Sequence, residues 1–131
     1  MVNRYRSDSF MSSDDCEDTL REIEAIREYN KTHGNYSAIL KELADKVRKI
    51  LPYLCRLPYN ITPTLADSIQ IEYINEIDEY LEFNIFKDKI VYFYCDKNRN
   101  METDEISSIE EMNVFIDEMF LLTRCFNIIG D

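Results

Sequence analysis

The sequence is poor in the residues on which much catalytic and phosphate-binding chemistry depends. Its 131 residues include two glycines, one histidine and no tryptophan. Glycine-rich loops that cradle phosphates are excluded, because few positions can adopt a positive φ at low cost. The single histidine, His33, lies in a predicted turn, and no serine or cysteine nucleophile motif accompanies it. We therefore predict a protein that is not an enzyme.

The cysteines and the hydrophobic residues give no signal for a metal, a membrane span or export. The four cysteines are widely spaced and form no CxxC pair, which predicts reduced thiols rather than a zinc site. No apolar run approaches the roughly 18 residues that a membrane span needs. The N-terminal residues also lack the apolar segment of a secretion signal. These absences predict a cytoplasmic protein with no cofactor and no metal.

The charge is strongly one-sided. Acidic residues number 26 against 15 Lys and Arg, so the formal net charge at pH 7 is −11. Direct binding to nucleic acid or to an anionic membrane is disfavoured, because both require Lys and Arg to neutralise phosphates. A basic protein partner is favoured, because complementary electric fields speed the encounter of two proteins.

The N-terminal part of the chain is predicted to be a tail followed by a helix. Residues 1–12 are polar and rich in serine, and we predict a flexible tail there, followed by a single domain over residues 13–131. The first helix is predicted from about Asp14 to Asn30. Ser12 or Ser13 can cap it, and acidic residues crowd its first turn, where the helix dipole favours them.

A second helix and an irregular connection are predicted next. Apolar residues recur at i, i+3, i+4 and i+7 from about Tyr36 to Leu51, which is typical of an amphipathic helix. Pro52 should end this helix. All three prolines of the chain fall between residues 52 and 67, so we predict an irregular, extended connection there.

The C-terminal half is predicted to be a sheet closed by a helix. Apolar and polar residues alternate in it with a period of two. Strands are predicted at 69–74, 80–86 and 90–95, with a weaker one at 101–106, and a helix begins at Ser107 or Ser108 in a capping box. The predicted class is α+β, with N-terminal helices followed by a three- to four-stranded antiparallel meander and a C-terminal helix packed on it.

The first hairpin has a register that the sequence indicates. If the chain turns about Ile77, the apolar cross-strand pairs are Ile69–Ile85, Ile71–Phe83 and Tyr73–Leu81. The same register places Glu72 opposite Glu82 on the other face. Two like charges in this position are destabilising. Either the two side chains splay into water, or a partner's cation relieves the repulsion.

The second hairpin is predicted from a loop at residues 87–89. The apolar pairs would then be Ile85–Val91, Phe83–Phe93 and Leu81–Cys95. The opposite face would mix carboxylates with apolar residues, which is too apolar for a plain solvated surface, so either a helix or a partner should cover it. This predicted face carries Tyr80, Glu82, Asn84, Phe86, Ile90, Tyr92 and Tyr94.

Several segments from about Tyr36 to Leu122 together resemble a known kind of protein. They are the loop LPYNITPT, the strands SIQIEY, YLEFNIF and IVYFY, and the final helix SIEEMNVFIDEMF. In this order they resemble small bacterial and phage α+β proteins encoded in mobile-element or toxin–antitoxin-like loci. The resemblance carries no catalytic motif, and it implies an accessory, protein-binding role.

Charge and pattern together predict a small acidic inhibitor that binds a basic, nucleic-acid-handling protein and occludes its cationic groove. An anti-CRISPR or other anti-defence protein, an antitoxin or an immunity protein would act in this way. The alternative is a non-catalytic structural module that forms a homodimer through the tyrosine-rich face; the predicted state is a monomer or a homodimer. The predicted partner-binding residues are Glu72, Glu76, Asp78, Glu79, Tyr80, Glu82, Tyr92 and Tyr94.

Overall fold

The computed structural model describes residues 10–26 and 36–129, with side chains at 10–26 and 39–120. Most of the predicted tail, the end of the predicted first helix and His33 lie outside this part of the chain. The elements, in chain order, are α1 (Ser13–Glu24), α3 (Tyr36–Ile50), the short 3-10 helix η2 (Leu51–Tyr53), β1 (Asn60–Pro63), β2 (Ile69–Ile74), β3 (Tyr80–Ile85), β4 (Ile90–Cys95), β5 (Met101–Ile106) and α4 (Ile109–Ile129).

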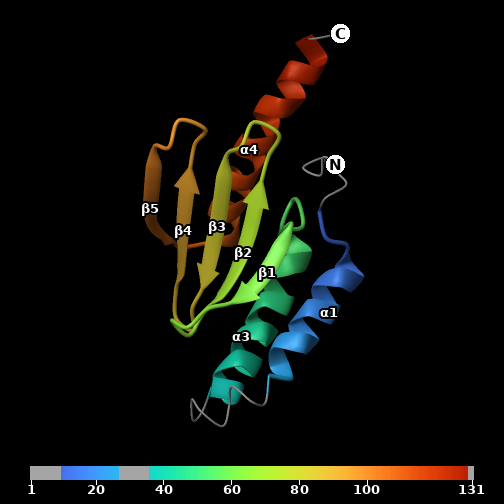
Figure 1. Ribbon diagram of the computed structural model, residues 1–131, viewed down its shortest axis with the longest axis vertical. Coiled ribbons are helices and arrows are strands. Elements are labelled where there is room, and N and C mark those ends of the chain that lie inside the picture. The colour runs from blue at the N-terminus through green and yellow to red at the C-terminus, as the bar shows by residue number, and fades with distance from the viewer. Residues whose placement is uncertain (1–9, 27–35, 130–131) are drawn as a thin grey trace.

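The architecture is α+β, as predicted, with an antiparallel sheet and a C-terminal helix packed on it. The strands follow one another across the sheet in the order β1-β2-β3-β4-β5. Figure 1 shows α4 crossing behind this sheet, with α1 and α3 side by side near β1. Among the described helices, none is long and apolar enough to cross a membrane.

The first helix starts where predicted and ends earlier. Ser12 caps α1 in a capping box, in which its hydroxyl accepts from the amide of Asp15 at 3.0 Å. The helix ends at Glu24 rather than at Asn30, so the predicted length is wrong. Ile23 is buried in the core and Ile26 packs against it, and the sequence continues from there with the polar residues Arg27 and Glu28.

The second helix matches its prediction closely. Its apolar stripe is fully buried at Leu40, Leu43 and Val47. Helical structure of the α type ends at Ile50, and Pro52 lies in the 3-10 turn that follows. Proline has no amide hydrogen to continue the α-helical bonding pattern, so it can occupy this terminal turn but not the interior of a longer helix.

The sheet has five strands instead of three or four, because β1 forms within the segment predicted to be irregular. Ile61 of β1 pairs with Ile71 of β2 and is buried. Pro63 closes the strand opposite Ile69. A proline is tolerated in an edge strand, where its missing amide hydrogen costs no bond in the sheet interior. Because the segment contains three prolines, it was predicted to be irregular, and the strand within it was missed.

The first hairpin has the predicted register in full. Ile69 pairs with Ile85, Ile71 with Phe83, and Glu72 with Glu82. The turn is organised by Asn75, whose side-chain oxygen accepts from the amides of Ile77 at 3.2 Å and Glu79 at 2.9 Å.

The second hairpin differs from its prediction by one residue. Phe83 pairs with Tyr92, and Leu81 pairs with Tyr94. The amide of Phe86 donates to the carbonyl of Lys89 at 2.9 Å, so only two residues remain in the loop instead of three. Because side chains alternate between faces, this single-residue shift turns every β4 side chain to the face opposite the predicted one.

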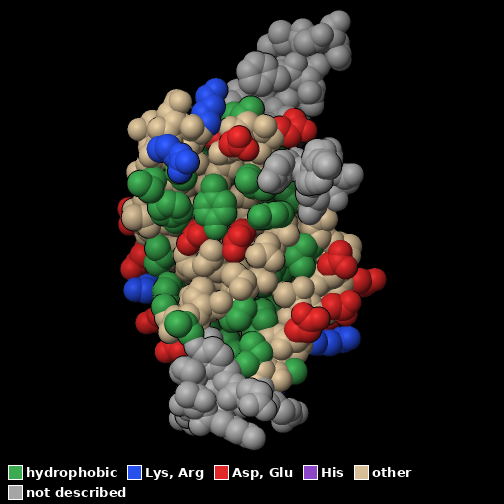
Figure 2. Space-filling view, in the orientation of Figure 1, with side chains coloured by type: hydrophobic (Ala, Val, Ile, Leu, Met, Phe, Trp, Pro, Cys, Tyr) green, Lys and Arg blue, Asp and Glu red, His purple; other side chains and the backbone are tan. Residues whose placement is uncertain are grey.

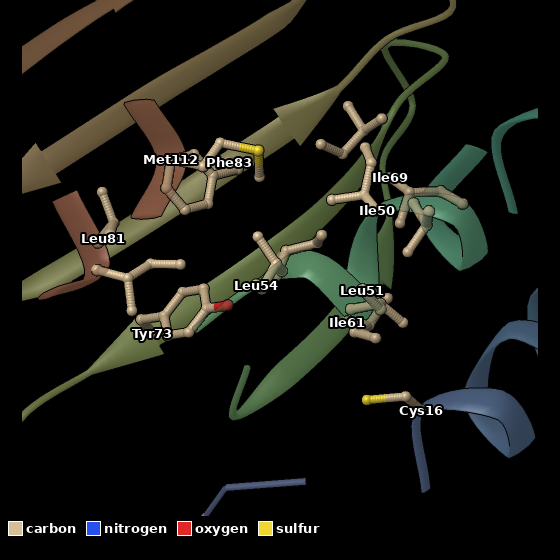
Figure 3. Close-up of a cluster of buried hydrophobic side chains, with 14 of the residues drawn as sticks. Cys16, Ile50, Leu51, Leu54, Ile61, Ile69, Tyr73, Leu81, Phe83 and Met112 are labelled. Atoms are coloured by element: carbon tan, nitrogen blue, oxygen red, sulfur yellow. The ribbon is translucent and has the colours of Figure 1, made fainter. Parts of the chain in front are cut away.

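One hydrophobic core lies between the sheet and the helices. It contains the face of the sheet that carries Tyr73, Leu81 and Phe83, together with Met112 and Ile116 of α4. Figure 3 shows the sheet residues meeting Met112 and the residues of the α3–η2 region.

The part of the predicted tail that the structure describes lies against the body. Phe10 makes an edge contact with Phe120 at 5.2 Å between ring centroids, and the amide of Met11 donates to the carbonyl of Pro58. Residues 1–9 lie outside the description.

Candidate functional site

The candidate site is the face of the sheet that points away from the core. We call it the outer face, and no described helix lies over it (Figure 1). In the space-filling view, acidic and hydrophobic side chains are interspersed over the sheet, while basic ones lie toward its margins (Figure 2). Its central residues are Gln70, Glu72 and Ile74 of β2, Tyr80, Glu82 and Asn84 of β3, and Val91, Phe93 and Cys95 of β4.

Glu82 lies at the centre of the outer face and accepts three hydrogen bonds from neutral groups. Gln70 Nε2 donates to Oε1 at 2.9 Å, and the Tyr80 hydroxyl donates to the same oxygen at 2.7 Å. Asn84 Nδ2 donates to Oε2 at 2.7 Å. These bonds hold the carboxylate in one orientation, but neutral donors leave its net charge in place.

Glu72 lies directly across the strand pair from Glu82. Its Oε2 accepts from Gln70 Nε2 at 3.2 Å and from Asn60 Nδ2 at 3.4 Å. Burial raises the pKa of Glu72, and the charge of Glu82 raises it further, while the bonds from Asn60 and Gln70 act in the opposite direction. The two glutamates are therefore held by shared neutral donors on the sheet rather than splayed into water.

The described part of the chain provides no cation for this pair. Among the described residues, no Lys or Arg nitrogen lies within 4 Å of the carboxylates of Glu72 or Glu82. Short described ion pairs lie elsewhere: Arg48 of α3 bonds Glu17 and Glu24 of α1 at 2.9 and 2.6 Å. The like-charge pair on the sheet is left without a compensating positive charge in the described structure.

Aromatic rings border the carboxylates. Phe93 lies directly opposite Glu82 in the β3–β4 pair and is half-buried. Its ring centroid is 6.3 Å from that of Tyr80, with an interplanar angle of 58°. Burial is the main cause that raises the pKa of Tyr80, followed by its hydrogen bond to Glu82. The outer face thus combines negative charge with flat apolar surface.

Six of the eight predicted site residues lie on the outer face or at the turn that adjoins it. Tyr80, Glu72 and Glu82 are brought together as described above. Glu76 and Asp78 are exposed in the β2–β3 turn, where Asp78 adopts a positive φ of 64°. Glu79 also lies at this turn, but its carboxylate is engaged by Asn75 and by a tyrosine from the other face.

Tyr92 and Tyr94 were predicted on the outer face, and this prediction is wrong. Both point to the helix side because of the two-residue loop of the second hairpin. Tyr92 is 5% exposed, and its ring lies 4.3 Å from that of Phe115 in α4. The Tyr94 hydroxyl donates to Glu79 at 2.8 Å. A helix-covered face can accommodate a tyrosine when its hydroxyl reaches a partner at the edge of the core.

The residue that sequence reasoning missed is Phe93. In the observed register, Val91, Phe93 and Cys95 of β4 lie on the outer face in place of the two tyrosines. The alternation of β4 is apolar on both faces, so periodicity alone could not choose between them. The signal that could have found Phe93 is the loop Lys87–Asp88, since hairpins with two-residue loops are the commonest.

The outer face presents carboxylates, side-chain amides and aromatic rings, which are groups that can bind a cationic side chain. Within the described residues, no group of three or more His, Cys, Asp and Glu side chains could hold a metal ion. Cys16 and Cys95 are free thiols, and burial raises the pKa of Cys16 to about 11, which makes it a poor nucleophile. The side chain of Cys125 lies outside the description.

In comparisons with known proteins, no protein-family model, no curated protein and no solved structure matches the chain. A functional conclusion must therefore follow from the outer face itself, with its charge, its hydrogen bonds and its rings.

Proposed function

We propose that this protein is a small acidic inhibitor that binds a basic, nucleic-acid-handling protein and occludes its cationic groove. An anti-CRISPR or other anti-defence protein, an antitoxin and an immunity protein all act through such a contact. The observation that carries the proposal is the Glu72–Glu82 pair, two directly opposed carboxylates on an uncovered sheet face that no described cation compensates.

The energetic argument concerns the repulsion within this pair. Like charges directly opposite each other on neighbouring strands cost about 0.2–1 kcal/mol. A partner's Lys or Arg seated between Glu72 and Glu82 would turn this repulsion into two favourable contacts. The net charge of −11 would also draw a basic partner toward the molecule and speed association at low salt.

Specific binding also needs contact area that excludes water. Tyr80 and Phe93 supply flat rings beside the carboxylates, and Ile74 and Val91 add half-buried apolar surface on the same face. A groove that binds nucleic acid is lined with Lys and Arg and contacts both charged phosphates and planar bases. The outer face presents negative charge and planar rings together, so it can occupy such a groove in place of the nucleic acid. This supports occlusion of a nucleic-acid groove over binding to an unrelated basic surface.

The alternative is a non-catalytic module that forms a homodimer through the same face. Stacking two outer faces would bring Glu72 and Glu82 of one copy toward those of the other, which adds like charges at an interface core normally depleted of charge. Sedimentation at micromolar concentration distinguishes the two: a monomer supports the inhibitor, and a stable dimer that dissociates on Phe93→Lys supports the module.

The proposal is tested by affinity capture followed by a competition assay. The immobilised wild-type protein should retain a basic protein that a Glu72→Gln, Glu82→Gln double variant fails to retain. The control variant Asp14→Asn, Asp18→Asn carries the same change of charge at exposed positions of α1 and should retain it.

The captured protein should then lose its bound nucleic acid as the wild-type inhibitor is added, measured by fluorescence anisotropy of a labelled oligonucleotide. If the captured protein holds the oligonucleotide equally well at saturating inhibitor, occlusion is the wrong mechanism. If both double variants capture equally, the outer face is not the binding surface.

A further inference from the structure

The outer face has a more specific chemistry than negative charge alone. Glu72 and Glu82 present two carboxylates side by side, and the Phe93 ring lies across the β3–β4 pair from Glu82. Glu82 is held by three hydrogen bonds. Both bonds to Glu72 reach the single atom Oε2. A fixed carboxylate, a neighbouring carboxylate and an aromatic ring therefore share one patch of the sheet.

We propose that this patch receives an arginine side chain of the basic partner, in preference to a lysine. The guanidinium group would bond Glu72 and Glu82 together and lie against the ring of Phe93. The inference rests on the proposed function, since it names the residue type through which the partner docks.

A guanidinium and an ammonium group differ in the features that favour binding to this patch. A guanidinium is planar and has five donors in a rigid fork, which can bond two acceptor groups at once. It is also weakly hydrated and stacks on aromatic rings. An ammonium is a compact, strongly hydrated point charge that loses more hydration on such a half-buried face. The bonds that orient Glu82 reduce the ordering that the complex requires, and this benefits a ligand with directional donors most.

Other occupants fit the patch less well. Within the described residues, the acidic groups do not form a cluster that could hold a metal ion. A second copy of the chain would present its own acidic outer face. An extended arginine-bearing segment matches the open sheet face in both charge and shape.

The test compares two peptides of equal charge, hexa-arginine and hexa-lysine, in NMR titrations of the full ¹⁵N-labelled chain at low salt. The side-chain amide signals of Gln70 and Asn84 report on the patch directly, because both amides donate to Glu82. We expect hexa-arginine to shift these signals and to bind roughly tenfold more tightly than hexa-lysine, a difference of about 1.4 kcal/mol.

Three variants separate stacking from charge. Phe93→Leu should lower the affinity for hexa-arginine to that for hexa-lysine, because it removes the ring and keeps the charge. Glu72→Gln with Glu82→Gln should weaken both peptides. The Asp14→Asn, Asp18→Asn control on α1 should leave the preference for arginine unchanged. The wild-type comparison stands on its own if a variant fails to fold.

The possible outcomes separate this inference from the proposed function. Equal affinities for the two peptides, with shifts at Gln70 and Asn84, would overturn the preference for arginine and leave the proposed function standing. If neither peptide shifts these two signals, both the inference and the assignment of the outer face as the binding surface are wrong.

Discussion

Replacing Glu72 by glutamine is expected to increase the free energy of unfolding at pH 7 by about 1 kcal/mol. Opposed side chains on neighbouring antiparallel strands have Cβ atoms about 5 Å apart. Two unit charges about 6 Å apart repel by about 0.7 kcal/mol in water and about 3 kcal/mol at an effective dielectric of about 20. Glu72 is half-buried, and neutral donors offset part of the repulsion, so the expected gain lies near the lower limit.

The pH dependence of this gain follows from the raised pKa of Glu72. A carboxyl whose pKa is higher in the folded state favours folding most below its unfolded value of 4.5 and loses that contribution as the pH rises through its folded value. At pH 4 the side chain is largely protonated in both states. The wild type and Glu72→Gln should therefore converge in stability at pH 4 and separate at pH 7.

The assay is urea unfolding followed by far-ultraviolet circular dichroism at the two pH values. Glu76→Gln is the matched control, because Glu76 is exposed in the β2–β3 turn and should give the wild-type stability at both. Added salt should shrink the gain of Glu72→Gln, since it screens the repulsion. A variant that is no more stable than the wild type at pH 7, or a gain of equal size at pH 4, would refute the account of this pair.

Substitutions at three further positions test other features of the fold. Tyr92→Phe should lower the free energy of unfolding by about 1 kcal/mol, because the hydrogen bond to Glu102 is lost. In the variant, the alkaline ultraviolet titration should also lack the ionisation of the Tyr92 phenol, whose pKa the bond to Glu102 raises to about 12. In the wild type, this bond contributes fully to the free energy of unfolding below pH 10, and the contribution is lost as the pH approaches 12. Arg48→Met should cost about 1–3 kcal/mol in thermal or urea unfolding. This cost should shrink below pH 4.5, because the bond to Arg48 lowers the pKa of Glu24 and the stabilisation is lost on protonation. Asp78→Gly should leave urea stability within about 1 kcal/mol of the wild type or raise it, whereas Asp78→Val should lower it by about 1–2 kcal/mol, because the position has φ 64°.

The first hairpin could be predicted because its two faces differ in polarity. A shift of one residue would have exposed Ile71 and Phe83 and buried Glu72, so the pattern admitted one register. The Glu72–Glu82 pair followed directly from that register. This part of the site was therefore available from the sequence alone.

The second hairpin and the first strand could not be predicted for the opposite reason. In β4, residues 90–95 are apolar or aromatic at every position, so both faces satisfied the pattern and loop length decided between them. As a result, the prediction placed Tyr92 and Tyr94 on the outer face, where the structure has Phe93. β1 was missed because Pro63 suggests a loop, while an edge strand accepts it.

The most direct test of the central claim is site-specific photo-cross-linking from the outer face, in cells of the organism that encodes the protein. A benzophenone amino acid replaces Phe93 in one variant and Val114 of α4, which is 55% exposed, in the other. The account predicts a covalent adduct from position 93 with a basic, nucleic-acid-binding protein and no such adduct from position 114. Adducts from position 114 alone, or an adduct from position 93 with a second copy of this chain, would contradict it.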